Sequence, residues 1–478
     1  MKRALFFLAV FGFVLVGCDG DLLVDNTDPN ATTDPSISGL LSTTILSTSN
    51  TTQGAAGVTS YYVQHLASPS GSAADQQFEA RFGGTWSSVY NVLGNAETLI
   101  EKAEEEESPH YAGIARIIQA YNLGLATDLW GDIPYQEALQ ADEGETTPGY
   151  DSQEQIYGEI QALLSDARDN LSAESRLSPG SEDFVYGGDL EKWKKAAWAL
   201  EARYLNHRTK KSSYDPQAVL RALDNAFEGN ADDAQMDYEN DPSNSPWHSV
   251  YLNEQGGILG GHLSEQLVKE MDGTLYGPLD PRLQAAITDS TETEAPEDSD
   301  PPAFAGNRNG AGSGDFYNHL EPQYYATVNA PILWITYAEV KFIEAEAAFR
   351  AGNPDRAYDA YRAGIRAHMN KVGVAGDQRD DYLNDPAVDV GQSGLTLDLI
   401  FKEKNVAMFL HPEAWVDHRR HDYDYPDFEP PLDQNPLFEG NPDTDYIRRV
   451  LYPLSELERN RSNVPEVELD RFLWWDQS

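Results

Sequence analysis

Cysteine and long apolar runs are both scarce in this chain. Cys18 is the only cysteine in 478 residues, so no disulfide can form within one chain. The apolar run from Ala4 to Gly17 has 14 residues, fewer than the roughly 20 that a helix needs to cross a bilayer. No later stretch is apolar enough to span a membrane. We therefore expect a soluble mature body that is held together by noncovalent packing.

Positive charge is also scarce. The chain has 34 Lys and Arg residues against 79 Asp and Glu residues, which gives a formal net charge of −45 at pH 7. This balance excludes nucleic acid as a natural partner, because phosphates would be repelled. The acidic residues are spread along the whole chain, which favours adaptation to high salt, since the Debye length falls to about 3 Å at ~1 M. The alternative is an acidic surface for cationic ligands or Ca²⁺.

The sequence lacks the common catalytic motifs. It contains no GxSxG, no HExxH and no phosphate-binding GxxxxGK[ST]. Its carboxylates could include a glycosidase acid/base pair, but sequence does not show a separation across a cleft. His411, His418 and His421 match no strict zinc spacing, and residues 289–300 lack the pattern of an EF-hand loop. Nucleophilic and nucleotide chemistry therefore lack support, and we expect no cofactor, with weak Ca²⁺ binding as the remaining alternative.

The N-terminus carries an export signal. Lys2 and Arg3 precede the apolar run, a pattern typical of a secretion signal over residues 1–17. The segment Leu15–Cys18 resembles the bacterial lipobox, whose cysteine receives lipid after cleavage just before it. We interpret Cys18 as a lipid anchor; the alternative is an incidental thiol beside an ordinary cleavage site. Residues 18–60, rich in Thr, Ser, Asn and Gly, are predicted to form a tether and an extended segment.

Apolar periodicity predicts a helical body. The stretch 332–370 indicates two packed helices, with Gly352 ending the first and Pro354 opening the second. This hairpin resembles tetratricopeptide packing, and residues 189–229 form a comparable one. One hairpin cannot bury its own face, so we predict an all-α fold in which such hairpins form a right-handed superhelical scaffold with long irregular loops. Further helices are predicted at 85–106, 109–128, 150–171, 395–409 and 411–420.

The helical pattern nearly vanishes over residues 230–330, apart from 263–271. Long loops in compact proteins commonly carry function, and the aromatic residues here argue against simple disorder. Flat aromatic faces can cover the C–H face of a sugar, while Asn side chains bond its hydroxyls. Loop packing is the alternative for each residue. The predicted ligand-binding residues are Tyr62, Trp247, Tyr251, Asn253, Phe316, Tyr317 and Asn318.

Several short motifs stand in order along the chain: Ala126–Tyr135, Trp193–Arg208, Asp280–Leu283, Thr336–Val340, Glu413–Trp415 and Tyr452–Pro453. Together they resemble the SusD/RagB family of outer-membrane lipoproteins. The resemblance implies a single SusD-like domain over residues 61–478, with no enzymatic activity. It implies a lipid-anchored protein of the cell surface that binds nutrient, most simply oligosaccharide but also peptide, and delivers it to a SusC-like TonB-dependent transporter. A surface glycoside hydrolase and a tetratricopeptide-type interaction scaffold are the alternatives.

Overall fold

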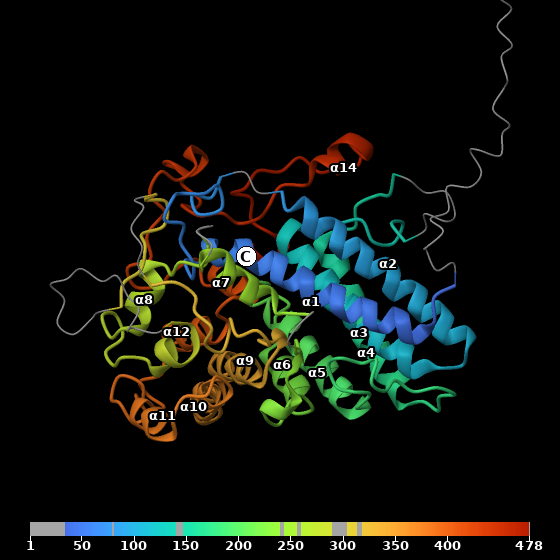
Figure 1. The fold of residues 1–478 in the computed structure, drawn as a ribbon, viewed down its shortest axis with the longest axis horizontal. Coiled ribbons are helices and arrows are strands. Elements are labelled where there is room, and N and C mark those ends of the chain that lie inside the picture. Colours follow the sequence, from blue (N-terminus) through green and yellow to red (C-terminus); the bar gives the residue numbers. More distant parts are fainter. Residues whose placement is uncertain are drawn as a thin grey trace, which may run out of the picture. The chain divides into compact units, whose positions relative to one another are not determined.

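The computed structural model describes residues 34–78, 81–139, 147–239, 243–255, 260–288, 304–312 and 318–477. The chain divides into units Met1–Ser36 and Ile37–Ser478, and the second unit contains the fold. It is built from helices joined by long loops, as Figure 1 shows. The prediction of an all-α fold is confirmed. The helices are α1 (Ile37–Tyr62), α2 (Gly83–Glu105), α3 (Pro109–Trp130), α4 (Gln153–Ser172), α5 (Leu190–Asn206), α6 (Pro216–Leu223), α7 (Pro246–Gln255), α8 (Glu265–Met271), α9 (Tyr337–Arg350), α10 (Pro354–Lys371), α11 (Gly376–Leu383), α12 (Leu397–Ala407), α13 (Glu413–Arg420) and α14 (Leu454–Arg459).

Helix α1 corrects the prediction of an extended segment up to residue 60. Its threonines and serines have poor helix propensity, yet they are largely buried against α2 and α3. The hydroxyl of Thr48 donates to the carbonyl of Thr44 at 2.8 Å, and that of Thr52 donates to Thr48 at 2.9 Å. These local bonds satisfy the hydroxyls inside the core. Tertiary burial therefore overrides propensity in α1.

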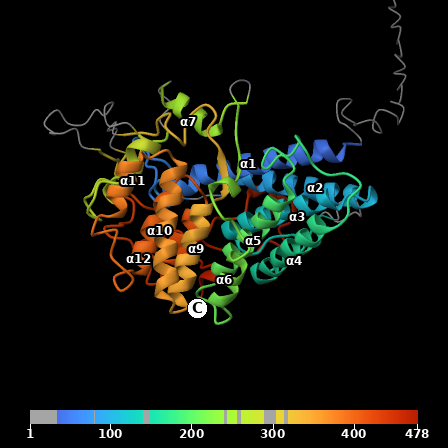
Figure 2. The same ribbon diagram turned by 90° about the horizontal axis from the view of Figure 1, so that it is seen from below.

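The predicted hairpins form the scaffold. Consecutive helices from α1 to α6 pack against one another, and α9 packs on α6, α10 and α12. Figure 2 shows α9, α10 and α12 side by side. Small residues permit this proximity: a Cβ added at Gly364 of α10 would lie 2.9 Å from the ring of Phe342 in α9. The Gly352 stop and the Pro354 start are both observed, with Asn353 capping α10.

The segment 230–330 contains more structure than its sequence pattern indicated. The short strand β1 (Ala234–Met236) pairs antiparallel with β2 (Ile332–Ile335). The first residues of the stretch 332–370 are thus a strand and not a helix, in keeping with the high strand propensity of Ile and Trp. Helix α8 matches the predicted helical interruption, whereas α7 was not predicted.

The C-terminal segment closes over the scaffold. Trp475 is fully buried, and its indole N–H donates to Asp128 at 2.8 Å. Trp130 and Trp86 are also core residues. Helix α14 has no buried residue. None of the helices in the described ranges combines the length and the apolar character that a membrane crossing requires.

Candidate ligand-binding site

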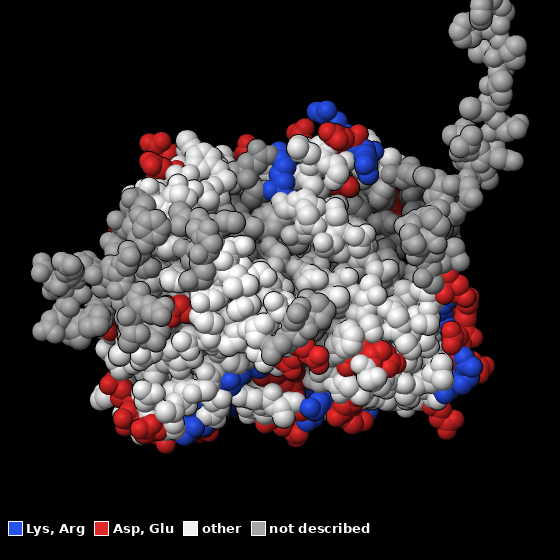
Figure 3. Space-filling model, in the orientation of Figure 1, with Lys and Arg blue, Asp and Glu red and all other residues white. Residues whose placement is uncertain are grey.

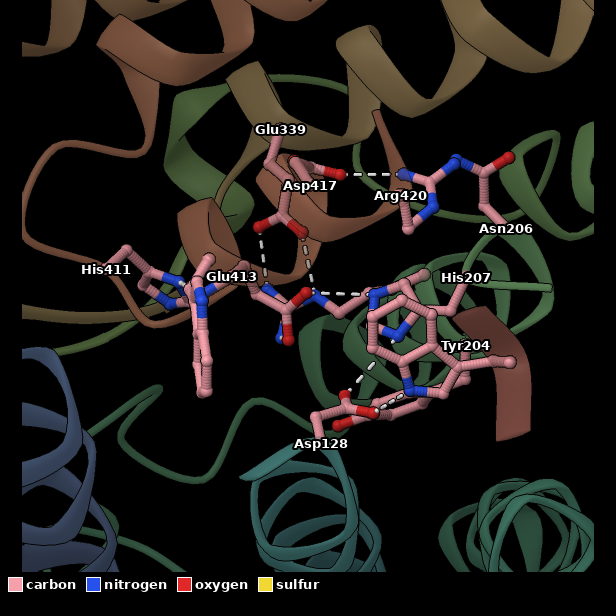
Figure 4. Close-up of polar contacts among 12 residues, drawn as sticks. Asp128, Tyr204, Asn206, His207, Glu339, His411, Glu413, Asp417 and Arg420 are labelled. Atoms are coloured by element: carbon pink, nitrogen blue, oxygen red, sulfur yellow. Dashed lines mark hydrogen bonds and ion pairs between the residues drawn. The ribbon is translucent and has the colours of Figure 1, made fainter. Parts of the chain in front are cut away.

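A buried polar network joins the helices beneath the loops (Figure 4). Arg203 of α5 donates through Nε and Nη2 to the two carboxylate oxygens of Glu339 in α9, at 2.7 and 2.6 Å. Glu346, further along α9, accepts hydrogen bonds from Arg420 of α13 at 2.5 Å and from Asn206 at 2.7 Å. Each of these side chains is nearly fully buried. The network fixes α5, α9 and α13 relative to one another.

Asp128, His207 and Glu413 lie together in this network, with candidate ligand atoms within 4.8 Å of one another. The ring of His207 is 2.9 Å from Glu413 at Nε2 and 3.4 Å from Asp128 at Nδ1. Burial by itself lowers the pKa of His207, but the carboxylates of Glu413 and Asp128 outweigh it and hold that pKa above its ordinary value. His207 thus lies at ion-pair distance from both carboxylates, and the three side chains form one buried cluster.

The three histidines considered from the sequence have separate partners. His411 contacts the backbone oxygen of Trp334 at 3.2 Å, and His418 contacts that of Ala414 at 2.9 Å. His421 lies 3.5 Å from Asp398. Arg419 and Arg420, which flank these histidines, make structural contacts. Arg420 pairs with Glu346, and Arg419 donates to backbone carbonyls including that of Asp128, at 2.7 Å.

The loop between α1 and α2 has an unusual backbone. Gln64, Gln77 and Phe82 all have positive φ, at 52°, 54° and 47°. A non-glycine residue in this region costs on the order of 1–3 kcal/mol, and such residues concentrate at functional sites. Contacts from distant segments hold the loop: Gln64 donates to the carbonyl of Glu429 at 2.7 Å, and Gln77 accepts from the backbone of Ile447 at 3.1 Å.

A hollow of about 290 Å³ opens beside this loop, and we call it the Phe82 hollow. Phe82 is half-buried and packs against Tyr62 and Trp130, with ring centroids 6.5 and 6.4 Å apart. The Tyr62 hydroxyl is buried without a hydrogen-bond partner among the described residues. A buried hydroxyl of this kind calls for a partner such as water or a ligand. The hollow is lined by Val58, Tyr62, Ala74, Arg81, Phe82, Gly84 and Thr85.

Arg81 lines both the Phe82 hollow and a second hollow of about 270 Å³, which we call the Tyr452 hollow. Its guanidinium donates to the backbone carbonyl of Tyr452 at 2.7 Å. The far wall of the Tyr452 hollow is formed by the segment from Leu457 to Val467, including the exposed Arg461. Each hollow is close to the lower end of the about 300–1,000 Å³ of small-molecule sites. An aromatic ring and an arginine thus line one hollow, and the buried hydroxyl of Tyr62 beside it has no hydrogen-bond partner among the described residues.

The structure separates the residues that the sequence proposed for ligand binding. Tyr62 lines the Phe82 hollow, whereas Trp247 is buried beside Tyr325 and Phe409. Asn318 is also buried, and its side-chain oxygen accepts from the backbone of Ala305 at 2.8 Å. On α7, Tyr251 is half-buried and Asn253 is exposed. Phe316, Tyr317 and Cys18 lie outside the described residues. Of these side chains, only Tyr62 lines the Phe82 hollow.

Sequence reasoning did not single out Arg81, Phe82 or Tyr452 as ligand-binding residues. The local feature that marks Arg81 and Phe82 in the sequence is their position immediately before Gly83, the first residue of α2. Tyr452 comes within reach of them only because the C-terminal segment folds back over the start of α2, and its ring lies 6.1 Å from that of Trp86. No local pattern encodes such a contact.

The chain has relatives among known protein families. A family model described as starch-binding and associating with the outer membrane matches residues 29–453. The chain belongs to the SusD-like family. The resemblance inferred from the sequence motifs is thereby confirmed. Among curated proteins, none matches the chain.

Solved structures share the SusD-like fold. A SusD homologue from Bacteroides fragilis superposes with a TM-score of 0.74 at 23% identity, covering 92% of this chain and 100% of its own. A SusD/RagB family protein from Bacteroides thetaiotaomicron gives 0.74 at 23% identity, with coverages of 93% and 99%. A chitin-binding SusD homologue from Flavobacterium johnsoniae gives 0.74 at 21% identity, with coverages of 92% and 98%. At these identities the likeness establishes the fold.

The motifs of the SusD-like chain include buried structural contacts. Asp280 and Arg282 form a side-chain pair with an Nε–Oδ1 distance of 2.9 Å. Thr336 caps α9 by accepting from the backbone N–H of Glu339 at 3.2 Å. Glu413 contributes to the cluster around His207. These motifs therefore stabilise the scaffold that carries the loops.

Proposed function

We propose that this SusD-like protein binds oligosaccharide at the Phe82 hollow and delivers it to a SusC-like TonB-dependent transporter in the outer membrane. The observation that carries the proposal is that Phe82, Arg81 and Tyr62 line one hollow beside a loop with several positive-φ residues. The family description, starch-binding and associating with the outer membrane, supports it. So does the chitin-binding homologue from Flavobacterium johnsoniae.

The chemistry of the Phe82 hollow suits a sugar. An aromatic ring offers an apolar face to sugar C–H groups, and a small number of polar groups fixes orientation. The guanidinium of Arg81 donates hydrogen bonds and accepts none, so its ligand partners are hydroxyl or carbonyl oxygens. The Tyr62 hydroxyl can both donate and accept. No bond is broken in this proposal, and transport energy comes from the transporter.

The proposed anchor is a lipid on Cys18, exposed on the cell surface after removal of residues 1–17. Residues 18–36 would then connect the anchor to the first residue of α1. Mass spectrometry of the mature protein tests this step. A diacylated or triacylated N-terminal Cys18 is expected, and a mature form that begins elsewhere contradicts it.

Binding is tested with protein lacking residues 1–18. We expect isothermal titration calorimetry to detect maltoheptaose or N-acetylchitohexaose, and Phe82→Ala to weaken that binding at least about tenfold, since an aromatic contact is worth about 0.5–1.5 kcal/mol beyond its area. Phe184→Ala is the matched control, because Phe184 is 47% exposed and lies between α4 and α5. Equal binding by both variants would remove the Phe82 hollow from the proposal.

Transfer to a transporter is tested by co-purification. Full-length protein, extracted from membranes with mild detergent, should carry a TonB-dependent barrel with it.

Measurement of new reducing ends in the same preparation checks the absence of hydrolysis. Release of sugar fragments that persists after purification to homogeneity would favour a glycoside hydrolase.

A further inference from the structure

A third hollow, of about 280 Å³, lies at a different part of the fold, between residues 278–284 and helix α11. We call it the α11 hollow. It shares no lining residue with the Phe82 or Tyr452 hollows. Both walls come from segments that the proposed function does not use. One of them contains the Asp280–Arg282 motif of the family.

Buried charges hold the two walls together. Arg282 pairs with Asp280 and also contacts Glu403 of α12. From the opposite wall, Tyr382 of α11 donates its hydroxyl to the other oxygen of Glu403, at 2.8 Å. All four side chains are almost fully buried. Glu403 therefore clamps both walls, and a hollow with fixed walls loses little entropy on binding a ligand.

The inner surface combines apolar and polar groups. Leu279 is 55% exposed and Phe304 is half-buried, so both present apolar surface. Around them, Gln284, Gln378 and Asp381 are exposed. In the described parts of the chain these three side chains have no hydrogen-bond or ion-pair partner. Their polar groups are therefore available to a ligand.

The charge of the α11 hollow selects among ligands. Asp381 and Asp385 line it, and neither Lys nor Arg is among the described lining residues. Two buried cations lie behind the walls, and both are paired: Arg282 with Asp280 and Glu403, and Lys402 with Glu403 at 2.8 Å and with the Tyr382 hydroxyl at 2.6 Å. Carboxylates accept hydrogen bonds from hydroxyl groups but repel anions. An acidic sugar is thus disfavoured.

We propose that the α11 hollow is a second saccharide subsite that binds a neutral sugar unit. Leu279 and Phe304 cover the C–H face of the ring, while Gln284, Gln378 and Asp381 bond its hydroxyls. Its volume suits one or two rings of a longer chain. The inference depends on the proposed function only in that the protein takes saccharides. It adds a binding position far in sequence from Phe82, and with it a preference for uncharged ligands.

The experiment uses protein lacking residues 1–18 with maltoheptaose, N-acetylchitohexaose and an oligogalacturonate as probes. Hydrogen exchange monitored by mass spectrometry locates binding. We expect a neutral probe to protect residues 278–284 and 376–383, and the oligogalacturonate to leave them unprotected. The double variant Gln378→Ala/Asp381→Ala should abolish that protection and weaken this binding about tenfold or more, because hydrogen bonds to a charged group contribute about 1.5–3 kcal/mol each.

Asp377→Ala is the matched control, since Asp377 lies on the same helix, carries the same charge and does not line the hollow. It should bind like the wild type. An equal loss in Asp377→Ala, or equal protection by oligogalacturonate, overturns the inference. Protection confined to the Phe82 hollow also overturns it while leaving the proposed function in place. If none of the probes binds anywhere, both proposals fail.

Discussion

At the scale of single residues, the scaffold depends on charges that are buried with their partners. Arg203 and Glu339 are each 1% exposed and form a two-bond pair. Replacing a partner of such a pair leaves an uncompensated charge in a medium that solvates it poorly. The pair fixes the orientation of α5 relative to α9. Its effect on stability is seen when one of the two side chains is removed and the other charge stays buried without a partner.

We expect Arg203→Met to lower the free energy of unfolding by about 3–5 kcal/mol, because Glu339 would remain buried without its cation. Urea denaturation at pH 7 measures the change. Arg221→Met is the control: the Arg221–Asp215 pair is 67% and 51% exposed, and exposed pairs contribute about 0–1 kcal/mol. Similar losses in both variants would contradict the role of burial.

His207 makes stability depend on pH. Its folded-state pKa is raised by Glu413 and Asp128, so its contribution is fully present below the unfolded pKa of about 6.5 and is lost as pH rises through the folded pKa. We expect the free energy of unfolding of the wild type to fall relative to His207→Gln over that alkaline window. Urea denaturation of both proteins at several pH values from 6 to 9 provides the test. Parallel pH curves would show that His207 gains no proton affinity on folding.

At the scale of elements, the predictable helices are those with strong apolar spacing and clear ends. The hairpin of α9 and α10 has both, in the stripe containing Phe342 and in the Gly352 and Pro354 boundaries. Helix α1 has neither, since its threonines and glycines suggest a loop. It is helical because α2, α3 and α13 surround it. Such burial is a property of the neighbours and not of the segment.

The hairpin prediction can be tested at Gly364. A Cβ there would lie 2.9 Å from the Phe342 ring, so Gly364→Ala should destabilise the protein by about 1–3 kcal/mol through overpacking. Gly158→Ala in α4 is the control, because nothing lies within 4 Å of its added Cβ. That substitution should stabilise the helix by up to about 1 kcal/mol. Thermal unfolding compares them, and two changes of the same sign would argue against close packing of α9 on α10.

At the scale of the whole molecule, charge is the dominant feature. Figure 3 shows acidic side chains gathered along the lower edge of this face, where Figure 1 places α5, α6, α10 and α11. With a net charge of −45, self-repulsion works against the compact state, and salt screens it.

We expect the melting temperature to rise by several degrees between low salt and ~1 M NaCl, where the Debye length is about 3 Å. Differential scanning calorimetry over a series of NaCl concentrations measures it, with Na₂SO₄ at matched ionic strength separating screening from specific chloride effects. An unchanged melting temperature across the series would count against adaptation to salt. The acidic surface would then need another explanation, such as cationic ligands.

The local sequence was sufficient for most helices, for the Gly352 and Pro354 boundaries and for the family, because helical spacing, caps and short motifs are encoded within a few neighbouring residues. The helical state of α1, the β1–β2 pair and the hollows at Phe82 and α11 were decided only by the tertiary structure. Each of these depends on residues far apart in the chain: Arg81 meets Tyr452, and Arg282 and Tyr382 meet at Glu403. Contacts over such separations arise from how the helices pack, and no short sequence pattern specifies them.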